Sequence, residues 1–291
     1  MDFVKAYYAK LNNMGDLLNE YLIPSVIGKR VIHCENVATF QIMGVGSCGG
    51  AIWGNKEDGT KEKLKDTIKH TACSVSKGKC AVWGTGFLKD YYPRKLQLLR
   101  NDVSFIAVRG ALSKRIIEHS LGIEINPVMC DGGILAAELF DSVPQKRFGV
   151  GLIPHYNEQH LIRKTGIQEA FENRFSHATL IDLRQDPLAV IKKIGECELI
   201  LSSSLHGCVV ADSFRIPNMR IKFSDIPGSG FKFDDYYSGF GLDIPPIVLE
   251  NYSTLPSEEQ IVTQYQITNQ MVELKKKQMA NCLTTFVSNL I

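Results

Sequence analysis

The stretch Leu199–Ile221, LILSSSLHGCVVADSFRIPNMRI, constrains the fold of this chain more than any other segment. Its first residues, Leu199–Leu201, form a short apolar run with the length of a buried parallel strand, and three serines end that run. Apolar residues then recur at helical spacing as far as Pro217, and a second β-like run follows. Strand, turn, helix and strand in this order predict an open α/β sheet of parallel strands.

The turn between the predicted strand and helix carries His206 beside Gly207. In open α/β sheets, ligands collect beyond the carboxyl ends of the strands, where the free N–H groups of helix N-termini bind anions. A histidine at this junction can bind a phosphate and move a proton. A capped helix with a buried histidine is the alternative interpretation.

Short β-like runs alternate with helical patterns along much of the chain, which favours two Rossmann-like halves. The predicted strands are Thr39–Val45, Cys80–Trp83, Val103–Val108, Phe148–Ile153, Thr179–Leu183, Leu199–Ser202 and Met219–Phe223. Helices are predicted at Ala111–Ser120 and Pro187–Gly195. The polar, proline-bearing link Asp141–Arg147 is the expected domain boundary. We therefore expect one domain over residues 1–145 and a second over residues 146–256.

The last segment, residues 257–291, contains neither glycine nor proline, and its apolar pattern predicts one or two amphipathic helices. Ser257 followed by two glutamates suits a helix N-terminus. We expect these helices to pack back across both halves; an oligomerisation helix is the alternative.

Composition excludes several classes of protein. The 33 basic and 31 acidic residues give a net charge of +2, too small for a general affinity for nucleic acid. No apolar run reaches about 18 residues, and the N-terminal residues lack the pattern of a signal peptide, so we expect a cytoplasmic protein. The eight cysteines form no CxxC pair, so we expect neither a metal site nor a disulfide framework.

Further candidate residues follow predicted strands. Glycine-rich turns containing Gly46 and Ser47, and then Gly86, can bring backbone close to a ligand, but they complete no dinucleotide fingerprint. The planar guanidinium of Arg109 suits a phosphate or carboxylate, although a surface arginine is the alternative.

His155 also follows a predicted strand. Two histidines at two strand ends, each near the ordinary pKa of about 6.5, would exchange protons near neutral pH. Lys232, in a glycine-rich loop before an aromatic helix, could face a phosphate or sugar, or simply the solvent. Asp16 precedes a predicted helix and could be its N-cap.

The segment SSSLHGCVVADSFRIPNMRI closely resembles the signature of the polysaccharide pyruvyl transferase family, in which a small-residue turn, Leu-His-Gly, Ala-Asp and Ile-Pro recur in this order. Elements similar to those of the family are also present at Asn13–Asp16, Val108–Gly110 and Ile153–His155, so the resemblance covers most of residues 11–237. The chain departs from the family after Asp131, where Gly132 replaces a proline, and at Ser204, where some members carry an arginine.

The resemblance implies a GT-B-like fold, with two Rossmann-like halves facing each other across a cleft. The acceptor would bind on the N-terminal side and the donor on the C-terminal side. It also implies transfer of pyruvate from phosphoenolpyruvate onto two hydroxyls of a sugar to form a cyclic ketal, with phosphoenolpyruvate as co-substrate and no cofactor. The acceptor would be a sugar or a lipid-linked saccharide, and a lipid-linked acceptor would bring the protein to the inner membrane face.

By the same resemblance, His206 is the acid or phosphate partner, Asp16 the base for a sugar hydroxyl, and Arg109 an anion ligand. The expected substrate-binding residues are Asn13, Gly15, Gly46, Ser47, Gly86, His155, Ser203, Ser204, Leu205, Gly207 and Lys232. Lys222 or Lys232 could replace the arginine that some family members carry at the position of Ser204. A glycosyltransferase that uses a nucleotide-sugar and a non-catalytic protein that binds sugar or phosphate are the alternatives.

Overall fold

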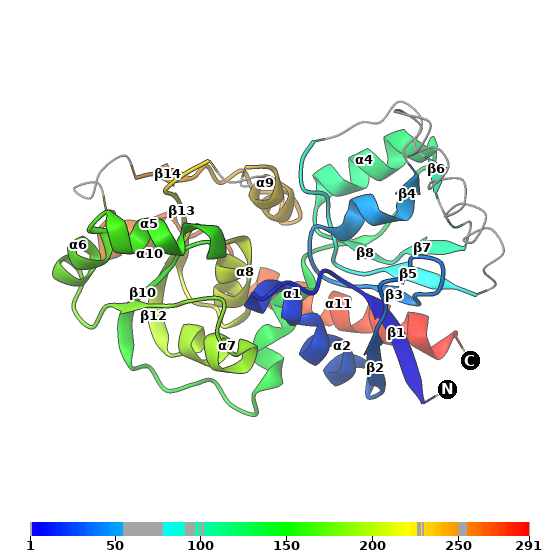
Figure 1. Ribbon diagram of the computed structural model, residues 1–291, viewed down its shortest axis with the longest axis horizontal. Helices are drawn as coiled ribbons and strands as arrows, with labels where there is room; N and C mark the ends of the chain where they lie inside the picture. The colour runs from blue at the N-terminus through cyan, green and yellow to red at the C-terminus, as the bar shows by residue number, and fades with distance from the viewer. Residues whose placement is uncertain are drawn as a thin grey trace.

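Two five-stranded sheets form the framework of the protein. The structure is a computed structural model, and it describes residues 2–54, 78–90, 97–98, 100, 102–225, 228, 230–249 and 255–290. The strand order is β2-β1-β3-β5-β7 in the first sheet and β11-β10-β12-β13-β14 in the second, and every pairing within them is parallel. The sheets lie side by side along the long axis (Figure 1). The predicted α/β class with parallel sheets is confirmed.

The first sheet contains β1 (Phe3–Tyr7), β2 (Arg30–His33), β3 (Ile42–Met43), β5 (Cys80–Val82) and β7 (Val103–Phe105). Its helices are α1 (Met14–Leu17), α2 (Asn19–Ile27) and α4 (Ala111–Leu121). The second sheet contains β10 (Phe148–Ile153), β11 (Thr179–Leu180), β12 (Cys197–Ser202), β13 (Asn218–Lys222) and β14 (Ile247–Val248). Its helices are η3 (Tyr156–Glu158), α5 (Gln159–Lys164), α6 (Ile167–Arg174), α7 (Pro187–Gly195), α8 (Leu205–Ser213) and α9 (Phe231–Ser238).

Both faces of each sheet are covered, as strands rich in apolar residues require. On β12, Leu199 and Leu201 pack in one cluster with residues of α5 and α6, while Ile200 points the other way, into a cluster with residues of α7 and α8. The first sheet similarly packs α2 on one face and α4 on the other. Each half is therefore a three-layer sandwich.

Short strands extend the carboxyl edge of the first sheet. Single bridges join Gly46 to Thr85 and Thr85 to Val108 at the end of β8 (Ala107–Val108), which pairs with β9 (Val128–Met129). The turns after β3, β5, β8 and β9 are thus held side by side. The remaining short elements nearby are η1 (Cys48–Ile52), β4 (Trp53–Gly54), β6 (Gln97–Leu98) and η2 (Gly132–Leu139).

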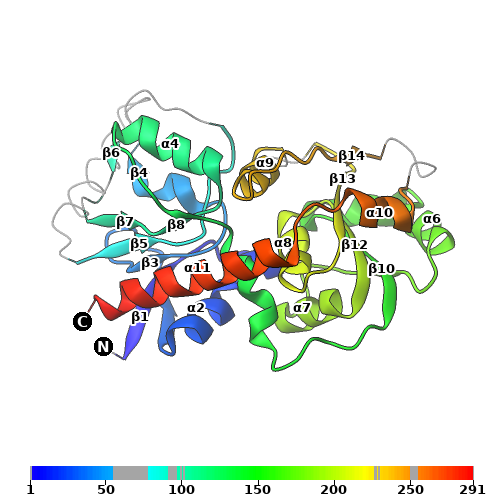
Figure 2. The same ribbon diagram turned by 180° about the vertical axis from the view of Figure 1, so that it is seen from behind.

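The C-terminal segment forms α10 (Glu258–Gln264) and α11 (Asn269–Ser288), and the predicted cap at Ser257 is confirmed by a capping box with Gln260. Helix α10 packs on β12 and β13, whereas α11 packs on α2 and η2. Seen from behind, α11 runs from the second half across the first, toward the N-terminus (Figure 2). The Trp83 Nε1–H donates to the Met279 carbonyl at 3.0 Å, which fixes α11 to the turn after β5.

Several predicted boundaries were wrong. The single strand expected at Val103–Val108 is divided into β7 and β8, and strands β1 and β2 near the N-terminus were missed. The first of these, FVKAY, is interrupted by Lys5 and so has no long apolar run, although its residues alternate between buried and less buried positions. Predicted strand Phe148–Ile153 and helix Pro187–Gly195 match β10 and α7 at both ends. The boundary near residue 145 stays a prediction.

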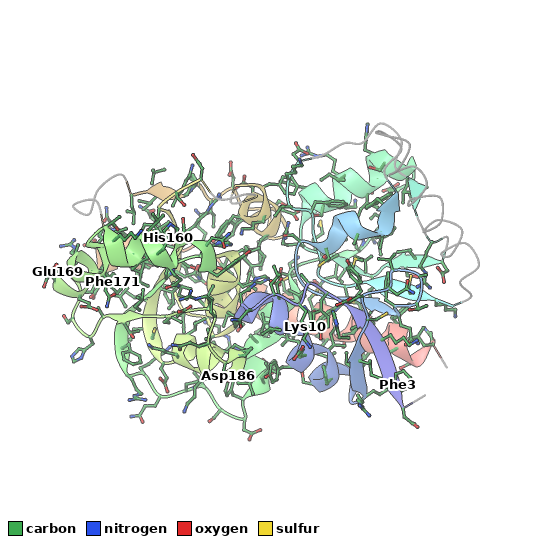
Figure 3. The ribbon with its side chains drawn as sticks, in the orientation of Figure 1. Phe3, Lys10, His160, Glu169, Phe171 and Asp186 are labelled. Atoms are coloured by element: carbon green, nitrogen blue, oxygen red, sulfur yellow. The ribbon has the colours of Figure 1, made fainter. Side chains whose placement is uncertain are left out.

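Glu169 and Phe171 on α6 lie toward one end of the long axis and Phe3 on β1 toward the other (Figure 3). Lys10, just after β1, lies between them. Within the described part of the chain, no helix is both long and apolar enough to cross a membrane.

Candidate active site

The carboxyl ends of strands from both sheets meet at one cavity of about 330 Å³. Its walls come from the segments that follow β1, β3, β5, β10, β12 and β13. We call it the central cavity; its lining residues are Ala9, Leu11, Asn13, Asp16, Ser47, Cys48, Leu88, His155, Tyr156, Asn157, Ser204, Leu205, His206 and Lys232. Ligand sites are expected at this edge of parallel sheets.

Asn13 and Asp16 line the central cavity from the N-terminal side. Asn13 is the N-cap of α1: its side-chain carbonyl accepts from the Asp16 N–H at 3.3 Å, and its amide donates to the Asp16 carboxylate. The interpretation of Asp16 as the N-cap was therefore wrong by three residues. Burial raises the pKa of Asp16 to about 6, although the Asn13 hydrogen bond and the positive charge of Lys232 both oppose the rise.

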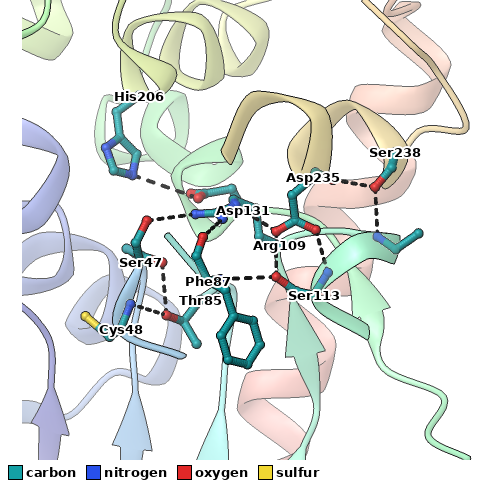
Figure 4. Close-up of polar contacts among 12 residues, drawn as sticks. Ser47, Cys48, Thr85, Phe87, Arg109, Ser113, Asp131, His206, Asp235 and Ser238 are labelled. Atoms are coloured by element: carbon teal, nitrogen blue, oxygen red, sulfur yellow. Dashed lines mark hydrogen bonds and ion pairs between the residues drawn. The ribbon is translucent and has the colours of Figure 1, made fainter. Parts of the chain in front are cut away.

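His206 lies at the start of α8, with its side chain 15% exposed. Its Nε2 faces the Oδ2 of Asp131 at 3.8 Å, and neither atom has a hydrogen-bond partner among the described residues (Figure 4). Asp131 is completely buried and its other oxygen accepts from the Gly133 N–H at 2.9 Å. Burial raises the pKa of Asp131 to about 6. The Asp131 carboxylate therefore faces the Nε2 atom of His206 without a hydrogen bond between them.

Gly15 explains how the imidazole fits beneath α1. A Cβ at position 15 would lie 1.9 Å from the Nδ1 of His206, which leaves no room for any other residue without displacement of the ring. The close approach puts Nδ1 on the side of the loop that carries Asp16. Gly15 is thus a packing residue for His206 and does not itself line the central cavity.

Lys232 brings a positive charge to the central cavity from the N-terminus of α9. Its side chain is largely buried, and its ammonium has no hydrogen-bond or ion-pair partner in the described part of the chain. Burial and the neighbouring positive charge of Arg109 lower its pKa to about 8, while Glu158 and Asp16 oppose that change. A largely buried ammonium without a partner favours an anionic ligand.

The expectation that both histidines titrate near pH 6.5 was wrong. Burial, and after it the positive charge of Lys232, lowers the pKa of His155 and of His206 to about 3. His155 also caps η3, where its Nδ1 accepts from the Asn157 N–H at 3.3 Å. Both rings are therefore neutral at pH 7 in the free protein.

Arg109 differs most from its predicted place. It is 1% exposed and lies behind the central cavity, where its Nε–H donates to Asp235 at 3.0 Å and its Nη1 donates to Ser47 at 3.1 Å. The anion that this arginine meets is a carboxylate of the chain itself (Figure 4). Asp235 also accepts from the N–H and hydroxyl of Ser113. Among its hydrogen-bond partners in the described ranges, Ser47 is the one that lines the cavity.

The other predicted residues divide into two groups. Ser47, His155, Ser204 and Leu205 line the central cavity together with the residues above. Gly46, Gly86, Ser203 and Gly207 lie behind the wall. The Gly86 N–H donates to the Gly46 carbonyl, Ser203 contacts Glu158, and Gly207 packs against Ser202. Lys222 is paired with Asp225 and does not reach the central cavity.

The profile of the family described as "Polysaccharide pyruvyl transferase" matches residues 42–223, more than half of the chain. The chain belongs to the polysaccharide pyruvyl transferase family. The resemblance found in the sequence is thereby confirmed. The matched range includes Arg109, His155 and His206, whereas Asp16 and Lys232 lie outside it.

The chain is also similar to the following two proteins. "Uncharacterized protein L143" of Acanthamoeba polyphaga mimivirus is 25% identical over 252 residues, which cover 81% of this chain and 74% of that protein. "Succinoglycan biosynthesis protein ExoV" of Rhizobium meliloti (strain 1021) is 39% identical over 66 residues, 23% of this chain and 21% of that protein.

Sequence reasoning assigned no role to three buried carboxylates of this pyruvyl transferase family member. They are Asp131 opposite His206, Asp235 beside Arg109, and Glu158, which accepts from Ser203 and Ser224. Asp131 and Asp235 face partners from distant parts of the sequence, so spacing gave no signal for them. For Glu158 the local signal is its place three residues after His155, with which it forms a capping box. Over the described ranges, no group of three or more His, Cys, Asp or Glu side chains is arranged to hold a metal ion.

Proposed function

We propose that the protein transfers the pyruvyl group of phosphoenolpyruvate to two hydroxyls of one sugar unit and so forms a cyclic ketal. The observation that carries this proposal is the meeting of Asp16, His206 and Lys232 at the central cavity of a member of this family. A carboxylate, an imidazole and an unpaired ammonium supply the base, the acid and the anion ligand that this transfer needs.

The proposal includes a GT-B-like arrangement of two Rossmann-like halves, residues 1–145 and 146–256. Supporting it, segments after strands of both sheets line the same cavity. The acceptor would approach from the side of Asp16, and the donor from the side of α8 and α9.

Phosphoenolpyruvate is a small polyanion, and the Lys232 ammonium is its proposed charge partner. The N-terminus of the nine-residue helix α8 adds backbone N–H groups and a partial positive charge. Ser47 would donate to the same anion while Arg109 holds its hydroxyl from behind. Lys232 would thereby supply the positive charge of the arginine that some family members carry at the position of Ser204.

The proposed reaction has two additions at the same carbon. One sugar hydroxyl adds to C2 of phosphoenolpyruvate, its proton passes to a base, and C3 gains a proton to become a methyl group. The C2–O bond to phosphate then breaks, and the second hydroxyl adds to C2 with loss of its proton. The products are the cyclic ketal and inorganic phosphate.

Asp16 is the proposed base, because a carboxyl group of pKa about 6 is mostly ionised at pH 7 and accepts a proton more readily than an ordinary aspartate. His206 is the proposed acid toward C3 or the departing phosphate. Asp131 would accept a hydrogen bond from Nε2–H and stabilise the imidazolium.

The test is calorimetric titration with phosphoenolpyruvate beside a panel of nucleotide-sugars. We expect phosphoenolpyruvate to bind, and Lys232→Met to weaken binding about tenfold or more, the size of a lost charged hydrogen bond. Lys277→Met, at an exposed lysine, is the matched control. Phosphate release with a sugar acceptor should disappear in His206→Ala.

Two results would contradict the proposal. Binding of a nucleotide-sugar with no response to phosphoenolpyruvate would favour a glycosyltransferase. Binding of phosphoenolpyruvate without phosphate release on any sugar acceptor would favour a non-catalytic binding protein.

A further inference from the structure

A second cavity of about 380 Å³ adjoins the central cavity at the carboxyl end of β13. Its wall includes Glu158, Ser203, Arg220, Phe233, Asp234 and Asp243. This volume lies in the range of small-molecule sites in proteins. The mechanism proposed above uses none of these side chains.

The carboxylate of Glu158 is a fixed acceptor in the wall of the second cavity. The side chain is 1% exposed. Its Oε2 accepts from the His155 N–H and the Ser203 hydroxyl, and its Oε1 accepts from the Ser224 hydroxyl at 2.7 Å. Three donors from three different segments hold the group in one orientation, which is the preorganisation that a specific polar contact needs.

In the described wall of the second cavity, both cations are already paired. The Arg220 guanidinium donates to Asp234 at 2.7 Å and stacks on the Phe233 ring, 4.4 Å from its centroid. Lys222 is paired with Asp225. With Asp243 and Glu158 added, the carboxylates outnumber the cations, so the cavity disfavours an anion. Carboxylates and a guanidinium instead suit hydroxyls, which both donate and accept hydrogen bonds.

The second cavity and the central cavity lie next to each other, because consecutive residues of two segments line one cavity and then the other. Ser203 lines the second cavity and Ser204 the central one, and consecutive Cα atoms are about 3.8 Å apart. In α9, Lys232 lines the central cavity while Phe233 and Asp234 line the second. A saccharide longer than one unit can therefore contact both cavities.

From this geometry we infer that the second cavity, although it lies in the half proposed to hold the donor, binds an uncharged sugar unit of the acceptor. This unit is adjacent to the one that receives the pyruvyl group, which approaches from the side of Asp16. The inference rests on the proposed pyruvyl transfer for the word acceptor. The binding of a neutral sugar in this cavity is measurable without any turnover.

Gly230 offers a way to fill the second cavity. It lines the cavity with a φ of −72°, a conformation open to every residue, and among the described residues the nearest neighbour of a Cβ there would be the Asp234 carboxylate at 3.9 Å. Gly230→Leu should therefore fold normally and occupy the space. Gly50→Leu is the matched control, because a Cβ at this exposed position meets no atom of the described ranges within 4 Å.

The experiment is saturation-transfer NMR on the full chain with methyl glycosides of glucose, galactose, mannose and N-acetylglucosamine, with lactose and cellobiose, and with uridine diphosphate. Each probe is used at about 10 mM, ten times a Kd of about 1 mM. We expect transfer to at least one sugar in the wild type and in Gly50→Leu, and its loss in Gly230→Leu. Asp243→Asn should weaken that sugar about threefold or more, whereas Asp141→Asn, at an exposed site, should not.

Three results would overturn the inference: no signal from any sugar, equal sugar signals in Gly230→Leu and the wild type, or uridine diphosphate binding that Gly230→Leu abolishes. Titration with phosphoenolpyruvate separates this failure from failure of the proposed function. Gly230→Leu should bind phosphoenolpyruvate as the wild type does. A wild type that binds the sugar but never phosphoenolpyruvate would overturn pyruvyl transfer and leave the sugar site standing.

Discussion

At the scale of single residues, the free site holds groups whose pKa values are shifted, and we expect a bound anion to change them. Burial sets the pKa of His206 to about 3, and Lys232, at about 8, adds positive charge beside it. Asp16 has a pKa of about 6. A bound polyanion stabilises the protonated form of every one of these groups, because it adds negative charge near each of them.

We therefore predict that phosphoenolpyruvate binding takes up protons at pH 8. Free Lys232 is about half protonated there, and a rise in its pKa on binding completes its protonation, so about half a proton is taken up. At this pH the second ionisation of a phosphate, with pKa about 6, is complete and contributes little. Calorimetry in two buffers of different ionisation enthalpy measures the number. Proton release on binding would contradict the prediction.

At the scale of elements, helix α9 follows a strand of the second sheet in the sequence but contacts segments of both sheets. It follows β13, yet its Asp235 is buried against Arg109 and Ser113 at the start of α4. Gly110 makes this approach possible, since a Cβ there would overlap the Asp235 carbonyl oxygen at 1.5 Å. Docking of Asp235 fixes Lys232, one turn earlier, in the central cavity.

Asp235→Ala should therefore lower the free energy of unfolding by about 3–5 kcal/mol, because it leaves the buried Arg109 charge without its partner. Glu273→Ala breaks the exposed pair with Arg215 and should cost under about 1 kcal/mol. Urea denaturation measures both. Equal effects of the two substitutions would show that the buried pair does not hold α9.

The elements also show where sequence reasoning stopped. Apolar runs and helical periods located β10, α7 and the C-terminal helices, since these patterns are local. Strands of two residues, such as β9 and β14, are too short to carry a period. His206, which the sequence places at a strand end, lines the central cavity, and its role there stays a prediction. The partners Asp131 and Asp235 were not predicted, because their pairing depends on how distant segments pack.

At the scale of the whole molecule, one apolar cluster joins the two sheets. It contains Val4 and Ile42 of the first sheet and Ile153 and Ile200 of the second. The Met14 N–H donates to the Leu183 carbonyl at 2.7 Å, so α1 is also tied to the second half. Loss of one half would expose part of the core of the other. The predicted boundary near residue 145 therefore does not separate two independent cores.

We accordingly predict one cooperative unfolding transition, although chains of this length often unfold through intermediates. Both tryptophans, Trp53 and Trp83, lie in the first half, whereas far-UV circular dichroism reports helices of both halves. The urea midpoints measured by tryptophan fluorescence and by circular dichroism should coincide in the wild type. Asp235→Ala should shift both midpoints by the same amount. A fluorescence transition separate from the dichroism transition would mean that the first half unfolds alone, and that the shared cluster adds too little to couple the two sheets.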